Sequence, residues 1–183
     1  MRKTQCHGGW DWGPDLMVSG IYGSIKLETY REGYFESLTA RYTQVKSSHD
    51  WTVHITAVYE SFAEGGHAFT FSVSCGGSVM SSCVRKFTLT TGTNIIHADI
   101  TVKHPDVWQT AGELAEKGKT ENTLYELSAA SEDGDSIITK LIAFRTVEVD
   151  TKKGALCFIV NGRRIFAKGA NWVPVDSLPE RWT

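Results

Sequence analysis

The 183-residue chain lacks a long apolar run, an excess of charge of one sign and a recognisable secretion signal. No stretch of 18 apolar residues occurs, so the sequence predicts no membrane span and no membrane partner. Lys and Arg number 19 against 21 Asp and Glu, so charge does not favour a nucleic-acid partner. Residues 1–7 contain no apolar stretch of the kind found in signal peptides. Together with cysteines that show no clear pairing, this favours a cytoplasmic location.

Cysteine is scarce, and its spacing excludes the usual structural metal sites. The four cysteines show neither a Cys-x-x-Cys motif nor histidines at zinc-finger spacing, so we expect neither a metal nor a cofactor. Cys75 and Cys83 flank the turn 76–78 and are candidates to face each other across a hairpin. We favour free, buried thiols as the simpler interpretation. The cysteines are Cys6, Cys75, Cys83 and Cys157.

Alternation of apolar and polar residues with a period of two dominates the chain, whereas helical periodicity is scarce. In the clearest stretch, 51–60, one face carries Trp51, Val53, Ile55, Ala57 and Tyr59. Turn-forming clusters of Gly, Ser and Asp separate the stretches. The pattern predicts an all-β fold, an immunoglobulin-like antiparallel β-sandwich of about seven strands with flanking partial elements. The expected strands are 35–43, 51–60, 68–75, 83–90, 94–102, 123–130 and 136–149.

Three segments fall outside the sandwich pattern. Residues 21–27 alternate as one further strand, ahead of a polar break at 29–33. Residues 103–122 are too long for a hairpin loop and contain, at 111–117, a stretch compatible with a single helical turn. Residues 156–167 predict a hairpin with a type I′ turn, because Asn161-Gly162 suits two consecutive residues of positive φ.

Residues 8–14 read Gly-Gly-Trp-Asp-Trp-Gly-Pro and place one carboxylate between two indole rings. Indole faces stack on the apolar faces of sugars, and a carboxylate accepts hydrogen bonds from sugar hydroxyls. The following Gly-Pro favours a loop. Core packing of Trp10 and Trp12, with Asp11 capping a turn, is the competing interpretation.

The order of motifs along the chain resembles β-mannosidases of glycoside hydrolase family 2. The motifs are Arg-Lys-x-Gln-Cys at 2–6, Gly-Trp-Asp-Trp-Gly-Pro at 9–14, Phe-Arg-Thr-Val-Glu at 144–148 and the run from Phe158 through Asn-Gly and Lys-Gly-Ala-Asn-Trp to Asp176. That family runs from a sugar-binding jelly roll through an immunoglobulin-like sandwich to a (β/α)8 catalytic barrel. The resemblance implies that 1–30 end the jelly roll, 31–148 form the sandwich and 149–183 are a hairpin and lead-in to the barrel.

The resemblance also indicates the substrate class. Galactosidase- and glucuronidase-type relatives carry an active-site His where this chain has Val173. A β-mannoside is therefore the expected carbohydrate partner of the full-length enzyme, and the jelly roll and barrel are the expected intramolecular partners. The nearest rival, a relative that acts on glucosaminides, is similar in the loop but lacks the second Trp-Gly-Pro.

Catalysis is not expected of this chain alone. Retaining glycosidases need two carboxyl groups roughly 5 Å apart, and in the family these are glutamates on later barrel strands, one of them preceded by Asn. The chain contains no Asn-Glu dipeptide, so we assign no catalytic residue in it and expect no hydrolase activity. The resemblance makes Asp11 a ligand of substrate hydroxyls. It makes Trp10 and Trp12 sugar contacts or supports of their loop, and Asn171 and Trp172 residues of the pocket floor or of barrel packing.

Three functional readings remain open. The first is a non-catalytic middle fragment of a β-mannosidase-like retaining hydrolase that removes β-D-mannose from non-reducing ends, with the sandwich as a spacer that packs on the barrel. The second is a free-standing carbohydrate-binding module that uses the loop around Asp11. The third is an immunoglobulin-like interaction domain. A sandwich alone does not decide between them, so the flanking motifs carry the assignment.

Overall fold

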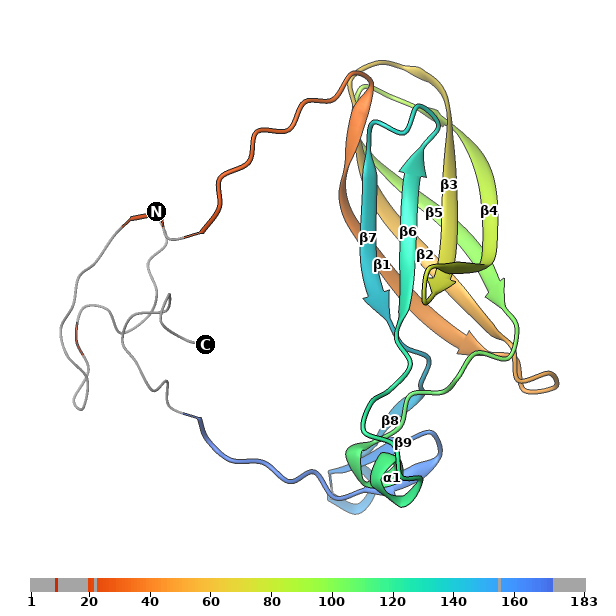
Figure 1. Cartoon of the computed structure of the whole chain (residues 1–183), viewed down its shortest axis with the longest axis vertical. Helices are drawn as coiled ribbons and strands as arrows, with labels where there is room; N and C mark the ends of the chain where they lie inside the picture. Colours follow the sequence, from red (N-terminus) through yellow and green to blue (C-terminus); the bar gives the residue numbers. More distant parts are fainter. Residues whose placement is uncertain (1–8, 10–19, 22, 155, 173–183) are drawn as a thin grey trace. The chain divides into compact units, whose positions relative to one another are not determined.

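The computed structural model describes residues 9, 20–21, 23–154 and 156–172 of the chain (Figure 1). The chain divides into two compact units, one formed by 29–166 and the other by 1–28 with 167–183. All of the described helices and strands belong to the first unit. No helix in the described part is long and apolar enough to cross a membrane.

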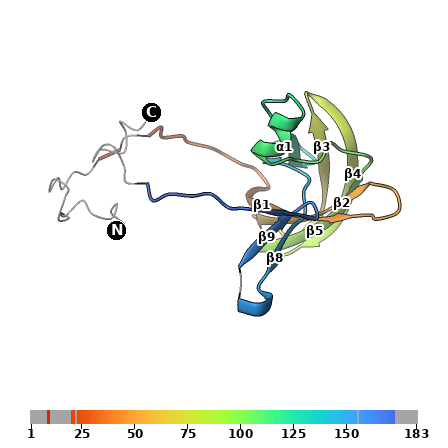
Figure 2. The ribbon, with the colours of Figure 1, turned by 90° about the horizontal axis from the view of Figure 1, so that it is seen from below.

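Seven antiparallel strands form two sheets that pack face to face, which confirms the predicted immunoglobulin-like sandwich (Figure 2). One sheet has the order β1-β2-β5 and the other the order β4-β3-β6-β7. Each pairing is antiparallel, with irregularities in register between Phe35 and Ser37 and between Val73 and Ser74. The strands are β1 (Gly33–Gln44), β2 (Trp51–Ser61), β3 (Gly65–Cys75), β4 (Ser78–Leu89), β5 (Gly92–Val102), β6 (Tyr125–Ser131) and β7 (Ile137–Ile142).

Alternation places the core as the sequence predicts. The apolar residues on the inner face of β2 are all buried between the sheets, and β3 contributes Phe69, Phe71 and Val73. At one end of this core, the fully buried ring of Phe144 lies 4.9 Å from that of Tyr125 and 5.7 Å from that of Trp51. Aromatic rings of this size bury large apolar areas and prefer such tilted or edge-on packing, so they hold this end of the sandwich together.

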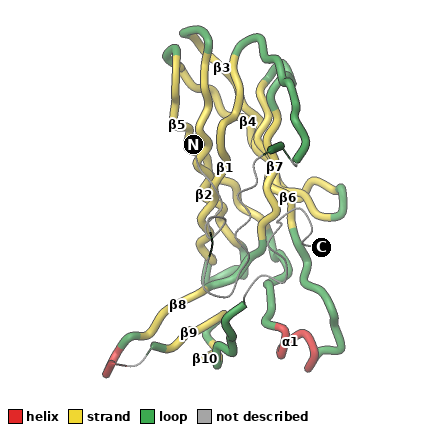
Figure 3. The backbone as a smooth tube through the Cα atoms, turned by 90° about the vertical axis from the view of Figure 1, so that its left-hand side faces the viewer, coloured by secondary structure: helices red, strands yellow, loops and turns green. Residues whose placement is uncertain are grey.

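A small third sheet follows the sandwich and lies at one end of it (Figure 3). Its order is β10-β9-β8, from β8 (Val147–Asp150), β9 (Cys157–Val160) and β10 (Arg163–Ile165), with a short 3-10 turn, η1 (Lys152–Gly154), before β9. Asn161 and Gly162 join β9 to β10 with φ values of 51° and 78°. The predicted hairpin is thereby confirmed, with left-handed backbone at both turn positions.

Two strand predictions need correction. The run 136–149 is not one strand but two, because β7 ends at Ile142 and β8, which begins at Val147, belongs to the third sheet. Between them Phe144 pairs with Val107 of the long loop. The predicted strand 21–27 is absent from the described residues of that stretch, where Ile25 and Leu27 are 74% and 93% exposed. Alternation marks a stretch that suits a sheet, but a strand also needs a neighbour with which to pair.

The long loop 103–122 contains α1 (Ala111–Glu116), the single helical turn that the sequence predicts. Cys75 and Cys83 do not face each other, because Cys75 pairs with Ser78 and Cys83 with Phe71. Cys75, Cys83 and Cys157 are free, partly exposed thiols rather than fully buried ones. The expected boundary between 148 and 149 falls within β8, and the domain limits themselves stay a prediction.

Candidate functional site

The described residues do not test the five predicted substrate-binding residues as a group. Trp10, Asp11 and Trp12 lie outside the described residues, as does Val173. Asn171 and Trp172 are described, and both are exposed, with 81% of Trp172 accessible. Their predicted roles therefore stay predictions. The described structure instead contains two polar junctions, one at each end of the sandwich.

The first junction surrounds Asn161 and is called the Asn161 junction, formed by Trp108, Thr146 and Asn161. The Asn161 side-chain Nδ2 donates to the carbonyl of Trp108 at 2.8 Å, and its Oδ1 accepts from the backbone N–H of Thr146 at 3.0 Å. The Asn161 N–H donates in turn to the carbonyl of Thr146. One side chain thus connects three segments: the long loop, the chain leaving β7 and the β9–β10 turn.

Neighbouring contacts fix the long loop in the same place. The N–H of Trp108 donates to the carbonyl of Phe144 at 2.8 Å, and the guanidinium of Arg145 lies 4.6 Å from the centre of the Trp108 ring. This is a cation–π distance. The side chain of Asn122 spans the base of the loop, since its amide donates to the carbonyl of Gln109 and its Oδ1 accepts from the Gln109 N–H. The long loop 103–122 is therefore fixed against the end of the sandwich, and we call it the brace.

Helix α1 connects the brace to the β9–β10 hairpin. Thr110 and Glu113 form a reciprocal capping box at the start of the helix. Hydrogen bonds from the Thr110 backbone and hydroxyl lower the pKa of Glu113, so Glu113 is ionised at neutral pH. The guanidinium of Arg163 in β10 lies 3.7 Å from Glu113 and 3.4 Å from Glu116. Exposed ion pairs of this kind are individually weak, and here they add to the Asn161 hydrogen bonds.

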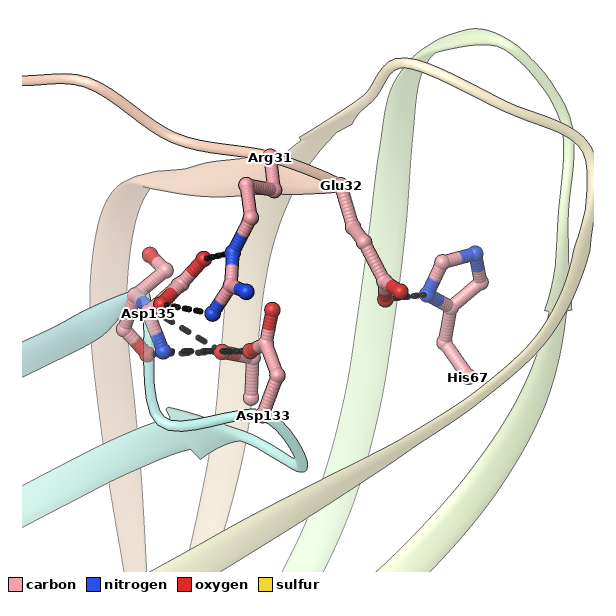
Figure 4. Close-up of polar contacts among 7 residues, drawn as sticks. Arg31, Glu32, His67, Asp133 and Asp135 are labelled. Atoms are coloured by element: carbon pink, nitrogen blue, oxygen red, sulfur yellow. Dashed lines mark hydrogen bonds and ion pairs between the residues drawn. The ribbon is translucent and has the colours of Figure 1, made fainter.

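The second junction lies where the chain enters β1, and we call it the Arg31 clamp (Figure 4). The guanidinium of Arg31 binds both carboxylate oxygens of Asp135, in the β6–β7 turn, at 2.5 and 2.8 Å. This hydrogen bond lowers the pKa of Asp135. Beside it, the N–H of Phe35 donates to the buried hydroxyl of Ser136 at 2.9 Å. Gly33 is also constrained, because a Cβ there would clash with the Glu60 carbonyl.

One further arrangement has the residue types of a catalytic triad but not the setting. The Thr43 hydroxyl lies 3.0 Å from His54 Nε2, and Asp99 Oδ1 lies 2.9 Å from His54 Nδ1. The three residues stand on neighbouring strands of the outer face of β1-β2-β5, where His54 and Asp99 side chains are 45% and 66% exposed. A triad also needs an oxyanion site and a cleft. We therefore interpret the row as cross-strand stabilisation of the sheet.

Within the described residues, no group of three His, Cys, Asp or Glu side chains is placed to hold a metal ion. The sequence alone does not predict the side-chain role of Asn161 or of Trp108. A signal for Trp108 existed, since a lone Trp in a long polar loop is rarely left without a packing partner. Asn161 was identified only as a turn residue, because its left-handed φ accounts for Asn by itself. The contacts of the described residues join segments of the chain at both ends of the sandwich, so their role is structural.

A sandwich tied in this way to a following hairpin is typical of a module within a larger chain, and known proteins bear this out. β-Mannosidase B of Emericella nidulans is 32% identical over 189 residues, which cover 97% of this chain and 21% of that protein. β-Mannosidase B of Aspergillus terreus is 33% identical over 191 residues, again with 97% of this chain but 20% of the relative. The chain thus spans about a fifth of the length of these relatives. No family profile matches it.

Solved structures agree with the sequence relatives. The β-D-mannosidase of Dictyoglomus thermophilum superimposes with a TM-score of 0.76 at 28% identity, over 96% of this chain and 22% of that one. A glycosyl hydrolase family 2 member from Bacteroides cellulosilyticus shares the fold, with a TM-score of 0.60 at 15% identity. Nearly the whole chain thus corresponds to a segment of β-mannosidases of glycoside hydrolase family 2, in agreement with its motifs.

Proposed function

We propose that the chain is the non-catalytic middle part of a β-mannosidase-like retaining glycoside hydrolase, which removes β-D-mannose from non-reducing ends. The observation that supports this most directly is the alignment of nearly the whole chain with about a fifth of each β-mannosidase relative. The chain contains no Asn-Glu dipeptide of the kind expected for the catalytic acid. The catalytic pair would then be supplied by the remaining four fifths of the enzyme.

In this proposal the sandwich is a spacer that packs on the barrel. The Asn161 junction supports a rigid spacer, because it fixes the third sheet to the sandwich through the brace. The Arg31 clamp holds the opposite end in the same manner. A spacer fixed at both ends would orient the preceding domain and the barrel relative to each other. Small shifts in such positioning matter, because catalysis depends on accurate placement of substrate groups.

We assign Asp11 the role of a substrate ligand, with Trp10 and Trp12 beside it and Asn171 and Trp172 nearer the barrel. The test is Asp11→Ala in the full-length enzyme, assayed with an aryl β-mannoside. A hydroxyl ligand that acts in the transition state should lower kcat/KM by about two orders of magnitude or more. Asp15→Ala, which removes a carboxylate four residues further along the chain, is the matched control. A loss below about threefold for Asp11→Ala would remove Asp11 from the site.

The same proposal predicts that the isolated 183-residue chain hydrolyses no β-mannoside, because the two carboxyl groups that retention requires are not both present. The assay compares purified chain with buffer, using the full-length enzyme as positive control. Turnover above the buffer rate would contradict the proposal. A free-standing carbohydrate-binding module is the alternative reading. Calorimetric titration of the chain with manno-oligosaccharides separates the two, since only the alternative expects saturable heat.

A further inference from the structure

A surface hollow of about 730 Å³ lies beside the exit from the sandwich. Its walls come from the end of β1, from the end of β7 and from the segment that leads into β8. The hollow therefore opens between the edge strands of the two sheets, next to the Asn161 junction. The lining residues are Ala40, Arg41, Tyr42, Leu124, Leu141, Ile142, Ala143, Arg145, Thr146, Val147 and Glu148.

Large apolar side chains stand exposed around this hollow. Leu124, Leu141 and Val147 are 49%, 66% and 55% accessible, and all three line it. Single exposed leucines are ordinary, but several around one concave surface are typical of a binding face. The apolar lining is therefore a surface suited to being covered by another piece of protein.

The residues that line the hollow carry a net positive charge. Arg41 and Arg145 are both exposed, whereas Glu148 is the single carboxylate in the lining. Within the described residues, no ion pair engages either guanidinium, and that of Arg145 lies over the Trp108 ring. Guanidinium groups form bidentate hydrogen bonds with carboxylates. The surface is thus complementary to an apolar segment that carries Asp or Glu.

We infer that this hollow is the docking site for an acid-bearing apolar segment of the parent enzyme's catalytic part, contributed in cis. The inference rests on the proposed function. The relatives are about five times as long as this chain, so most of the parent lies outside it. The lining segment 143–148 leads into β8 and the Asn161 junction, so the surface is continuous with the route toward whatever follows. Arg41 and Arg145 select the occupant by charge.

The test is photo-cross-linking in the full-length enzyme. A benzophenone amino acid replaces Leu141 in one variant and, as matched control, Val84 in another. Val84 is 57% exposed on β4, at the opposite edge of the same sheet. Mixing nitrogen-15-labelled with unlabelled enzyme separates cross-links within one chain from those between two copies. The inference expects intrachain products from position 141 to one segment beyond residue 183 that contains Asp or Glu, and none from position 84.

Charge is tested by a second pair of variants. Arg41→Glu should lower the yield of the position-141 cross-link by about fivefold or more, since it sets like charges against each other. Lys86→Glu, an equally exposed reversal on β4, should leave the yield unchanged. Circular dichroism checks that each variant is folded.

Three results would overturn the inference: cross-links between copies, cross-links only to a segment without Asp or Glu, and no protein cross-link from position 141. An unchanged yield in Arg41→Glu would do the same. The proposed function fails separately, if the unmodified full-length enzyme shows no β-mannosidase activity. In that case an acid-bearing intrachain cross-link would still support docking.

Discussion

Replacing Asn161 by Ala should release the third sheet from the sandwich. Asn161 combines a left-handed backbone, with φ of 51°, and a side chain that bridges Trp108 and Thr146. Ala can supply neither hydrogen bond. It also disfavours the left-handed conformation, because its Cβ approaches the following carbonyl, whereas Asn tolerates this conformation. The substitution therefore combines two losses at one position.

The size of the effect follows from these two losses. Each of the two side-chain hydrogen bonds contributes about 1 kcal/mol net. The left-handed backbone adds about 1–2 kcal/mol when Asn becomes Ala. The free energy that holds the junction closed should therefore fall by about 3–4 kcal/mol in Asn161→Ala. Asn161→Gly, which removes the backbone penalty but not the lost hydrogen bonds, should lose about 2 kcal/mol.

The assay is native-state hydrogen exchange at the backbone N–H of Thr146, which donates to Asn161 Oδ1. Exchange at this amide reports opening of the junction without requiring the sandwich core to unfold. Amides in the centre of β2 serve as the internal control and should keep their protection. A fall of less than about 0.5 kcal/mol at Thr146 in Asn161→Ala would refute the reasoning, as would equal losses at Thr146 and in β2.

Two further predictions concern the core and the Arg31 clamp. Phe144→Ala should lower the free energy of unfolding by about 3–5 kcal/mol in urea denaturation, because it leaves a cavity among three aromatic rings; a loss below about 1 kcal/mol would contradict this packing. The pKa of Asp135 is lowered from its ordinary 3.8 by Arg31, so the clamp stabilises the fold above that pH and loses its effect as pH falls through the folded pKa. In thermal melts Arg31→Ala should thus be less stable than wild type at about pH 6, and this difference should shrink as pH falls below 3.8. A pH-independent difference would refute the assignment.

Local patterns predicted much of the fold because each carries its own physical cause. The alternation in 51–60 predicts a half-buried strand, and the apolar residues at 51, 53, 55, 57 and 59 are all buried. Asn161-Gly162 predicts a tight hairpin, because both residue types tolerate positive φ. Both residues adopt positive φ in the structure. These features depend on residues that are close together in the chain, so the local sequence is enough to predict them.

The failures arose where a partner strand decides the outcome. The run 136–149 alternates without a visible break, yet Phe144 leaves the sandwich sheet to pair with Val107. Nothing in the local pattern marks this change of neighbour. The stretch 21–27 has the same kind of alternation and forms no strand in its described residues. Alternation therefore specifies which face of a strand is apolar and not whether a neighbour is present.

The residues of the expected sugar site stay a prediction, whereas the two polar junctions of the described structure were not predicted from the sequence. The resemblance in motifs predicts Asp11, and Asn171 and Trp172 in the barrel lead-in, as substrate-binding residues. The described structure adds contacts that no motif contains, since Asn161 reaches across 53 residues to Trp108 and Arg31 across 104 to Asp135. Contacts of this separation depend on the assembled topology.

The Arg31 clamp and the Asn161 junction lie at opposite ends of the long strands (Figure 1). The length of the sandwich therefore sets the distance between them. Its length is set by strands such as β2, whose 11 residues span roughly 35 Å at about 3.3 Å per residue. Adding one residue to a regular strand would turn its apolar face outward, so a strand without a bulge can be lengthened only by two residues at a time, or about 7 Å. A bulge accommodates a single extra residue, as β1 does between Phe35 and Ser37, so finer adjustment of the distance between the two ends comes from bulges and from the connecting segments.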